Sequence, residues 1–323
     1  MDVLAIGNAL VDVLAMVSDE ELAALGIVKD SYELVDAQTA DRLYQAMPPA
    51  VEISGGAAAN TAVGVASLGG AAGYLGMVRD DQLGAVFTHD LRATGVRFET
   101  AAATSGPPTG RALTFITPDG HRTFRTFLGA ATRLGPDDVD EEAVAAADVT
   151  YLEGYLWDPP SAKEAFRKAM AVAHGAGRRV ALTLSDPVCV TNWGGEFAEL
   201  LEQGKVDILF ANELELLTLF PGTLHDAIEH VRGVCQVAAV TRSEQGSIIV
   251  AGAETHEVPA APAEVVDTTG AGDLYAAGFL YSLTRGDDLV RCGELGSLCA
   301  AEVISHVGAR PQRSLAELVS AAG

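Results

Sequence analysis

The chain has 323 residues, 49% of them hydrophobic, and its 44 acidic and 21 basic side chains give a formal net charge of −23. This length suffices for one large α/β domain or for a large domain with a small appendage. The acidic surface repels nucleic-acid backbones and anionic lipid, which disfavours partners of both kinds. No run of about 18 apolar residues is free of charge or turn residues, which disfavours a membrane span. The cysteines and histidines form no zinc or HExxH pattern, which disfavours a structural metal.

The N-terminal sequence MDVLAIGNALVDV lacks the basic region of a signal peptide and is typical of a buried first strand. The four cysteines at 189, 235, 292 and 299 show no CxxC pairing. We therefore expect a reduced protein in the cytoplasm.

Short apolar runs rich in Val, Ile and Leu alternate with helical patterns along the chain. The predicted strands lie at 2–7, 73–77, 148–153, 179–184, 206–210, 236–241 and 247–251. The predicted helices lie at 58–68, 81–94, 138–147, 160–175, 195–203, 213–220, 225–233, 271–284 and 288–305. Continuous apolar strands that alternate with helices are typical of an α/β fold whose mostly parallel sheet is covered on both faces.

Two segments depart from this alternation, at 11–36 and 97–128. The runs RALTFIT and HRTFRTF are joined by a TPDG turn and indicate a hairpin. We expect these segments to form a small β lid over the ligand edge of the sheet, while 1–10, 37–96 and 129–323 form the large domain. The alternative is that they are extra edge strands of the main sheet.

The string SGGAAANTAVGVASLGG at 54–70 combines a glycine pair with a polar residue one helical turn later. Gly55 and Gly56 allow the backbone to approach a polyol closely, and the Asn60 amide offers a donor and an acceptor to adjacent hydroxyls. Tight helix packing explains the alanines of this string, but it does not explain Asn60, a weak helix former.

The most informative string is DTTGAGDLYAAGF at 267–279. Gly270, Ala271 and Gly272 open a predicted helix whose free amides and positive dipole end make an anion site. Asp273 lies in the first turn, beside any bound phosphate, where its carboxylate can accept the proton of an attacking hydroxyl. The alternative is an acidic helix start after a glycine turn.

Other enzyme classes lack their signatures in this chain. There is no GxxxxGK[ST] for a P-loop enzyme and no GxSxG for an α/β-hydrolase. A dinucleotide dehydrogenase needs GxGxxG after the first strand, but that position reads GNALVD, and Tyr275 replaces the third small residue of the later glycine string.

Together, DTTGAGDLYAAGF and SGGAAANTAVGVASLGG resemble the two signatures of the ribokinase-like (PfkB) family of carbohydrate and nucleoside kinases, in the family's order and spacing. The resemblance extends over essentially the whole chain. It implies a three-layer αβα fold and an ATP-dependent phosphotransferase, with Asp273 as catalytic base and the 270–272 amides around the transferred phosphoryl group.

Further residues take roles by the same resemblance. Asp12 in GNALVD resembles the substrate carboxylate that holds a vicinal diol, together with Gly55, Gly56 and Asn60. The resemblance assigns the nucleotide to Asn212, Thr241, Gly246, Thr268, Gly270, Gly272 and His306. Glu215 in FANELEL resembles the family's glutamate that organises Mg²⁺ through water. Ser243 replaces a glycine of the nucleotide loop VTRSEQGS, and His306 is as consistent with an ordinary surface histidine.

Arg122 in the lid corresponds to an arginine that reaches the phosphates in nucleoside kinases of this family, with Arg125 as the alternative. A solvated lid charge is the other interpretation. The strings GNALVD, NELE and TLSDPVCV are most similar to the adenosine-kinase branch, although Thr183 replaces an asparagine there.

The predicted function is transfer of the γ-phosphate of ATP to a primary hydroxyl of an adenosine-like nucleoside, with Mg²⁺ and an undetermined requirement for a monovalent cation such as K⁺. A free sugar or sugar acid (ribose, fructose or 2-keto-3-deoxygluconate) is the alternative acceptor, and a non-catalytic binding relative is the alternative class. Phe115, Phe124 and Leu156 are candidates to contact a purine or to pack the lid. We expect a small-molecule substrate, no nucleic-acid or membrane partner, and a monomer or homodimer.

Overall fold

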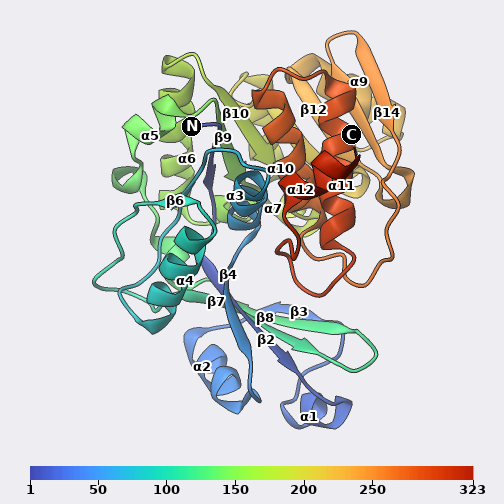
Figure 1. The fold of residues 1–323 in the computed structure, drawn as a ribbon. Helices are drawn as coiled ribbons and strands as arrows, with labels where there is room; N and C mark the ends of the chain where they lie inside the picture. Colours follow the sequence, from blue (N-terminus) through green and yellow to red (C-terminus); the bar gives the residue numbers. More distant parts are fainter. Residues whose placement is uncertain (323) are drawn as a thin grey trace.

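A computed structural model describes residues 1–322 and contains two β-sheets (Figure 1). Within these residues the larger sheet has nine strands in the order β14-β13-β12-β11-β10-β9-β1-β5-β6. They are β1 (Val3–Ile6), β5 (Ala72–Leu75), β6 (Arg97–Phe98), β9 (Val149–Glu153), β10 (Arg179–Thr183), β11 (Ile208–Asn212), β12 (Val237–Thr241), β13 (Ser247–Ala251) and β14 (Glu254–Val258). All neighbours from β12 to β6 are parallel, and only β13 and β14 at one edge are antiparallel.

Helices cover both faces of this sheet, because its inner strands are apolar on both sides and bury both, whereas the edge strand β14 is largely exposed. One face is covered by α3 (Ala57–Ser67), α4 (Gln82–Ala93), α10 (Ala271–Thr284) and α11 (Leu289–Val303). The other is covered by α5 (Glu141–Ala146), α6 (Pro160–Gly175), α7 (Pro187–Glu202), α8 (Glu213–Leu219) and α9 (Leu224–Val234). The final helix, α12 (Leu315–Ala322), packs beside α11 and α3. The predicted three-layer α/β fold is confirmed.

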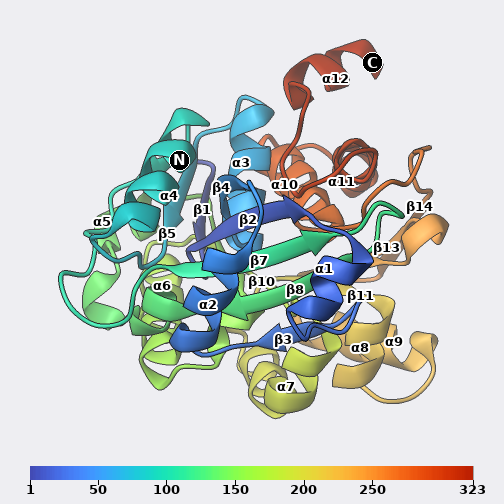
Figure 2. The same ribbon diagram turned by 90° about the horizontal axis from the view of Figure 1, so that it is seen from below.

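The smaller sheet has the order β3-β8-β7-β2-β4 and lies across one end of the larger sheet (Figures 1 and 2). Its strands are β2 (Leu10–Met16), β3 (Tyr32–Leu34), β4 (Val51–Gly55), β7 (Gly110–Ile116) and β8 (Arg122–Phe127), and it carries α1 (Asp19–Ala24) and α2 (Ala37–Ala46). The β7–β8 hairpin turns at Gly120, whose φ of 85° requires glycine.

The boundaries of this second unit differ from the predicted ones. We expected 37–96 in the large domain, but β4 pairs antiparallel with β2, and α2 packs on β7 and β8. Conversely, β6 belongs to the larger sheet. The chain thus crosses between the two sheets at Gly55, directly before α3.

No helix within residues 1–322 is both long enough and apolar enough to cross a bilayer. The four cysteines are free thiols.

Candidate active site

The candidate site lies at the carboxyl ends of β1 and β9, beneath the smaller sheet. From β1 the chain continues into β5 on one side of the larger sheet and later into β9 on the other, so the winding direction reverses at β1. Crevices at such reversals are the usual ligand sites of open α/β sheets. Here Asn8 follows β1 and Glu153 ends β9, and both are buried.

Glu153 fixes the start of α3. Its Oε1 accepts a hydrogen bond from Asn8 Nδ2 at 2.8 Å, and its Oε2 accepts one from the amide of Ala58 at 2.8 Å. The helix has Gly56 as its N-cap and no capping side chain of its own, so this carboxylate from a neighbouring strand replaces the cap. Burial is the largest effect on Glu153 and raises its pKa to about 7.

Asp12 and the glycine pair meet where β2 and β4 enter the larger domain. A Cβ atom on Gly55 would lie 2.3 Å from the Asp12 carboxylate, so only glycine fits beside this acid. Gly56 has a φ of 93°, and a Cβ there would lie 2.2 Å from the carbonyl oxygen of Asn8. Burial raises the pKa of Asp12 to about 6, opposed by the positive charge of Arg310.

Asp273 lies in the first turn of α10 and is half-buried. Its Oδ2 accepts a hydrogen bond from Asn60 Nδ2 at 2.9 Å, and its main-chain oxygen accepts one from Thr61 Oγ1 at 3.2 Å. Burial raises the pKa of Asp273 to about 6, while the Asn60 bond and the charge of Arg310 act in the opposite direction. A carboxylate of this kind is ionised at neutral pH yet basic enough to accept a proton.

The start of α10 is open to an anion. Gly270 is the N-cap, with a φ of 81°, and brings no side chain to the helix end. Ala271 donates its amide to the Thr268 carbonyl at 3.2 Å, which leaves the amides of Gly272 and Asp273 in the first turn. A Cβ on Gly272 would meet nothing within 4 Å, so space is free beside these amides.

Arg122 of β8 links the smaller sheet to this loop. Its Nη1 lies 2.6 Å from Asp267 Oδ2 and donates to Thr269 Oγ1 at 3.1 Å, while its Nη2 is buried without a partner. Arg125 instead contacts Ser31 and Glu33 within the smaller sheet. Of the two arginines considered from the sequence, Arg122 is the one beside the 267–270 loop before α10, where the phosphates are predicted to bind.

Asn212 and Glu215 form a reciprocal cap at the start of α8. The Asn212 amide and side-chain nitrogen donate to Glu215 at 2.9 and 2.6 Å, and the Glu215 amide donates to Asn212 Oδ1 at 2.8 Å. Burial raises the pKa of Glu215 to about 7. Both carboxylate oxygens are therefore engaged by Asn212, and no described contact joins them to Asp273.

The predicted nucleotide loop, VTRSEQGS, follows β12, which pairs with β11. Thr241 lies opposite Asn212 across the β11–β12 pair. Gly246 has a φ of 83°, and a Cβ there would lie 2.0 Å from the carbonyl oxygen of Val258. Ser243, which replaces a glycine of the motif, adopts a positive φ of 52°. The loop thus keeps a glycine-like turn despite the substitution.

The remaining nucleotide candidates are less engaged with the site. Thr268 is exposed and contributes its carbonyl to Ala271. His306 Nε2 lies 3.3 Å from Oε1 of Glu302, which is near the end of α11, and no described contact brings His306 toward Asp273.

A cluster not predicted from the sequence borders the site at the ends of β9 and β10. Tyr155 donates its amide to Ser185 Oγ at 3.1 Å, and Asp186 caps α7. Burial raises the pKa of Tyr155, and the charges of Asp186 and Asp273 act in the same direction. Burial also raises the pKa of Tyr32 on β3, and the charge of Asp186 acts in the same direction, so the lid extends to this cluster. By contrast, Phe115 and Leu156 are fully buried core residues.

Within residues 1–322 no group of three or more His, Cys, Asp or Glu side chains is arranged to hold a metal ion. Mg²⁺ at nucleotide sites is usually held by phosphate oxygens and water together with one or two carboxylates.

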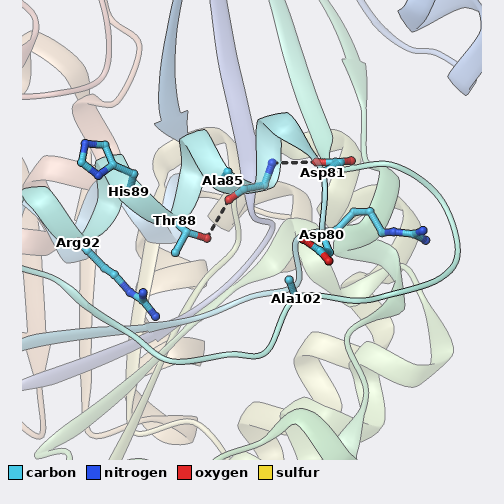
Figure 3. A pocket seen from close by; sticks show the side chains of 9 residues that line it. Asp80, Asp81, Ala85, Thr88, His89, Arg92 and Ala102 are labelled. Carbon is cyan, nitrogen blue, oxygen red and sulfur yellow. Dashed lines mark hydrogen bonds between the residues drawn. The ribbon is translucent and has the colours of Figure 1, made fainter.

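A separate pocket of about 400 Å³ lies beside α4 (Figure 3). Arg79, Asp81, Thr88, His89 and Arg92 are among its lining residues, and none of the predicted site residues lines it. Asp81 caps α4 and accepts from Thr109 just before β7, so this region supports the connection to the lid.

Three residues with strong contacts in the site were missed at the sequence level: Glu153, Asp267 and Arg310. Glu153 left a signal, since it is a charged residue that ends the apolar run DVTYLE. Asp267 stands inside the recognised DTTGAGD string. Arg310 left no local signal, because its partners are about 250 positions earlier in the chain.

Comparisons with known proteins agree over the full chain. The family model described as pfkB family carbohydrate kinase matches residues 19–315. The crystal structure of adenosine kinase from Sinorhizobium meliloti is 52% identical, covers 100% of this chain and 99% of that chain, and has a TM-score of 0.92. A probable sugar kinase protein from Rhizobium etli CFN 42 is 50% identical, covers 100% and 98%, and has a TM-score of 0.93. The adenosine kinase of Saccharomyces cerevisiae is 30% identical over 330 residues, covering 94% of each chain.

Proposed function

Because the chain belongs to the pfkB family of carbohydrate kinases and is an ATP-dependent kinase with a hydroxyl acceptor on a nucleoside or sugar, we propose that it phosphorylates the primary hydroxyl of an adenosine-like nucleoside. The predicted family resemblance is thereby confirmed. The observation that carries the proposal is the position of Asp273, half-buried in the uncapped first turn of α10 and hydrogen-bonded to Asn60.

The proposed reaction begins with the acceptor held by Asp12 and the Gly55–Gly56 backbone. Asp12 accepts hydrogen bonds from the two vicinal hydroxyls of a ribose, which its carboxylate geometry suits. Asn60 holds the Asp273 carboxylate in place. This arrangement leaves the primary hydroxyl of the nucleoside to face Asp273.

Phosphoryl transfer then needs one proton acceptor and an anion site. The hydroxyl oxygen forms a bond to the γ-phosphorus of ATP, the bond from that phosphorus to the β-γ bridging oxygen breaks, and the hydroxyl proton moves to Asp273. The first-turn amides of α10 hold the negative charge of the transferring group. Arg122 lies beside these amides through its pair with Asp267, and its unpaired Nη2 is available to a phosphate oxygen.

We propose that Mg²⁺ would be held mainly by the ATP phosphates and water, with Asn212 and Glu215 nearest to it at this sheet edge. When bound, the ion neutralises phosphate charge. Glu215 would organise the ion mainly through water, since Asn212 engages its carboxylate. Thr241 and Gly246, at the same sheet edge as Asn212, contact the nucleotide.

The preference for a nucleoside over a free sugar is supported by Tyr155, Tyr32 and Asp186. Tyr155 remains 39% exposed and Tyr32 59% exposed, although large aromatic side chains are usually more buried. Aromatic faces stack on a purine, and a carboxylate accepts a hydrogen bond from its amino group. A free ribose has no group that would use these three side chains.

A free sugar or sugar acid is the second candidate acceptor, favoured by the 50% identity to the probable sugar kinase protein. The two are separated by ADP release with adenosine, other nucleosides, ribose, fructose and 2-keto-3-deoxygluconate. We expect adenosine to exceed every free sugar in kcat/KM by at least about 100-fold, because the purine contacts add binding energy that sugars lack. A higher kcat/KM for a free sugar would refute the nucleoside assignment.

We also propose a cytoplasmic location, supported by the four cysteines, which are all free thiols.

A further inference from the structure

Arg310 lies in the segment between α11 and α12 and holds the loop that contacts the acceptor. Its Nη1 donates to the carbonyl oxygen of Ala59 at 2.9 Å. Its Nε and Nη2 donate to the carbonyl oxygen of Ser54 at 3.0 and 2.6 Å, and Nη2 also donates to Ser54 Oγ at 3.0 Å. These two carbonyls flank Gly55 and Gly56, so one guanidinium joins both ends of the glycine loop.

This arrangement requires the shape of arginine. The guanidinium presents five donors in a planar fork, which allows simultaneous bonds to two separate carbonyls. A lysine would place one nitrogen at one of them. Ser54 is held from its other side by Asp90 of α4, which accepts from the Ser54 amide at 2.8 Å and from Oγ at 2.5 Å. Ser54 therefore joins Arg310 to a second fixed element.

The same segment also contacts residues 267–270, the loop before α10 that we propose binds phosphate. The amide of Gly308 donates to Asp267 Oδ2 at 2.8 Å. A Cβ on Gly270 would lie 2.8 Å from the Cβ of Ala309, so the N-cap of α10 packs directly on this segment. Residues 308–310 thus contact both loops between which the phosphoryl group is transferred.

Arg310 binds the backbone beside both carboxylates: the Ser54 carbonyl precedes Gly55, which packs on Asp12, and the Ala59 carbonyl precedes Asn60, which donates to Asp273. Its charge opposes the effect of burial on the pKa of each carboxyl. Burial in turn lowers the pKa of Arg310 to about 10, and the charge of Asp12 is the largest effect opposing that decrease. Among the other titratable groups, Arg122 from β8 acts on Asp12, and Tyr74 from β5 and Asp90 from α4 act on Arg310. The charge of Asp273 in turn helps to raise the pKa of Tyr151 and Glu153 from β9 and of Tyr155.

We propose that Arg310 is a positioning residue that fixes the Gly55–Gly56 loop and supplies the positive charge opposite Asp12 and Asp273. This inference rests on the proposed function, because it assumes that Asp12 binds the acceptor and that Asp273 takes its proton. It goes further by assigning two separable contributions to one side chain, the shape of the donor fork and the charge.

Three variants separate these contributions, with adenosine as acceptor and ADP release as the signal. Arg310→Lys keeps the charge and loses the fork, so we expect the KM for adenosine to rise at least about tenfold while the acid limb of kcat/KM stays in place. Arg310→Gln loses the charge as well as the fork, so the acid limb moves upward by about one pH unit in addition to the rise in KM, and its difference from Arg310→Lys isolates the charge. Arg310→Met shows both effects. In all three, the KM for ATP changes by less than about threefold.

The matched control is Arg291→Met on α11, a surface arginine that pairs with Glu294, and it leaves KM and the acid limb unchanged. An Arg310→Met enzyme with wild-type KM and acid limb would overturn the proposal. So would an equal loss of kcat at every pH accompanied only by a lower Tm, which is the behaviour of a purely structural residue. If Arg310→Met does not fold, the Lys and Gln variants decide. If wild-type enzyme does not use adenosine, the nucleoside assignment fails, and the best acceptor of the panel tests Arg310 in its place.

Discussion

Replacing Asp273 with asparagine removes the proposed base and changes little else. The asparagine side chain keeps an oxygen that can accept the hydrogen bond from Asn60, so the local contacts survive. With a pKa of about 6, Asp273 is about 97% ionised at pH 7.5, so nearly all wild-type molecules use it at that pH. Loss of a general base typically reduces rates by about 10²–10⁴-fold, which corresponds to about 3–5 kcal/mol of activation free energy.

The same variant has a second signature in stability. The carboxyl of Asp273 binds its proton more tightly in the folded chain than in the unfolded chain, so stability falls as the pH rises from 3.8 through about 6. At neutral pH this corresponds to at most about 3 kcal/mol of destabilisation, less after allowance for solvent screening. Asp273→Asn removes that cost, so its Tm at pH 7.5 should equal or exceed that of the wild type.

The assay measures kcat by ADP release, ATP affinity by calorimetry and Tm by thermal unfolding. We expect kcat to fall 10²–10⁴-fold, ATP affinity to stay within about threefold and Tm not to decrease. Asp226→Asn is the control, because Asp226 is also an acid in the first turn of a helix but is exposed on α9. Normal turnover in Asp273→Asn would refute the role of Asp273 as the base. Low turnover together with a lowered Tm would indicate misfolding instead.

Three further outcomes follow from the geometry. The pH profile of kcat/KM should fall steeply below about pH 6, because Asp12 and Asp273 both have pKa values of about 6 and both must be ionised; a flat profile from pH 5 to 8 would contradict this. Gly55→Ala should raise the KM for the nucleoside at least about tenfold, since the new Cβ would lie 2.3 Å from the Asp12 carboxylate. The control is Gly233→Ala on α9, which should leave KM unchanged because a Cβ there meets nothing within 4 Å. Arg122→Met should lower kcat about 10–100-fold. In the wild type, both substrates together should protect residues 97–128 from protease, and the variant should lose this protection. Equal cleavage of the wild type with and without substrates would exclude lid closure.

Much of the fold was predictable because local pattern and tertiary structure agree. The predicted helices at 160–175 and 271–284 match α6 and α10, and the TPDG turn joins β7 and β8 as expected. The helix predicted at 195–203 was wrong at its start, since α7 begins at Pro187 after the N-cap Asp186. A Pro at the first helical position is a start signal, and it was available in the sequence.

The remaining differences come from long-range pairing. The segment VEISG could have paired with either sheet, and only the antiparallel register of Leu10 with Gly55 places it in the smaller one. The motifs identified Asp12, Asn60 and Asp273, and the structure brings Asn60 to Asp273 across 213 positions. Local sequence strings could not indicate Arg310, or Tyr155 with Tyr32, because their surroundings are assembled from distant segments.

In the proposed mechanism, Asp273 takes the proton of the acceptor hydroxyl while the first turn of α10 holds the phosphoryl group. A crystal structure with adenosine and a non-hydrolysable ATP analogue tests it most directly. We expect the primary hydroxyl oxygen to lie about 2.6–3.2 Å from an Asp273 carboxylate oxygen, with the terminal phosphate on the amides of Gly272 and Asp273. A hydroxyl directed away from Asp273, or a terminal phosphate bound elsewhere, would contradict the account.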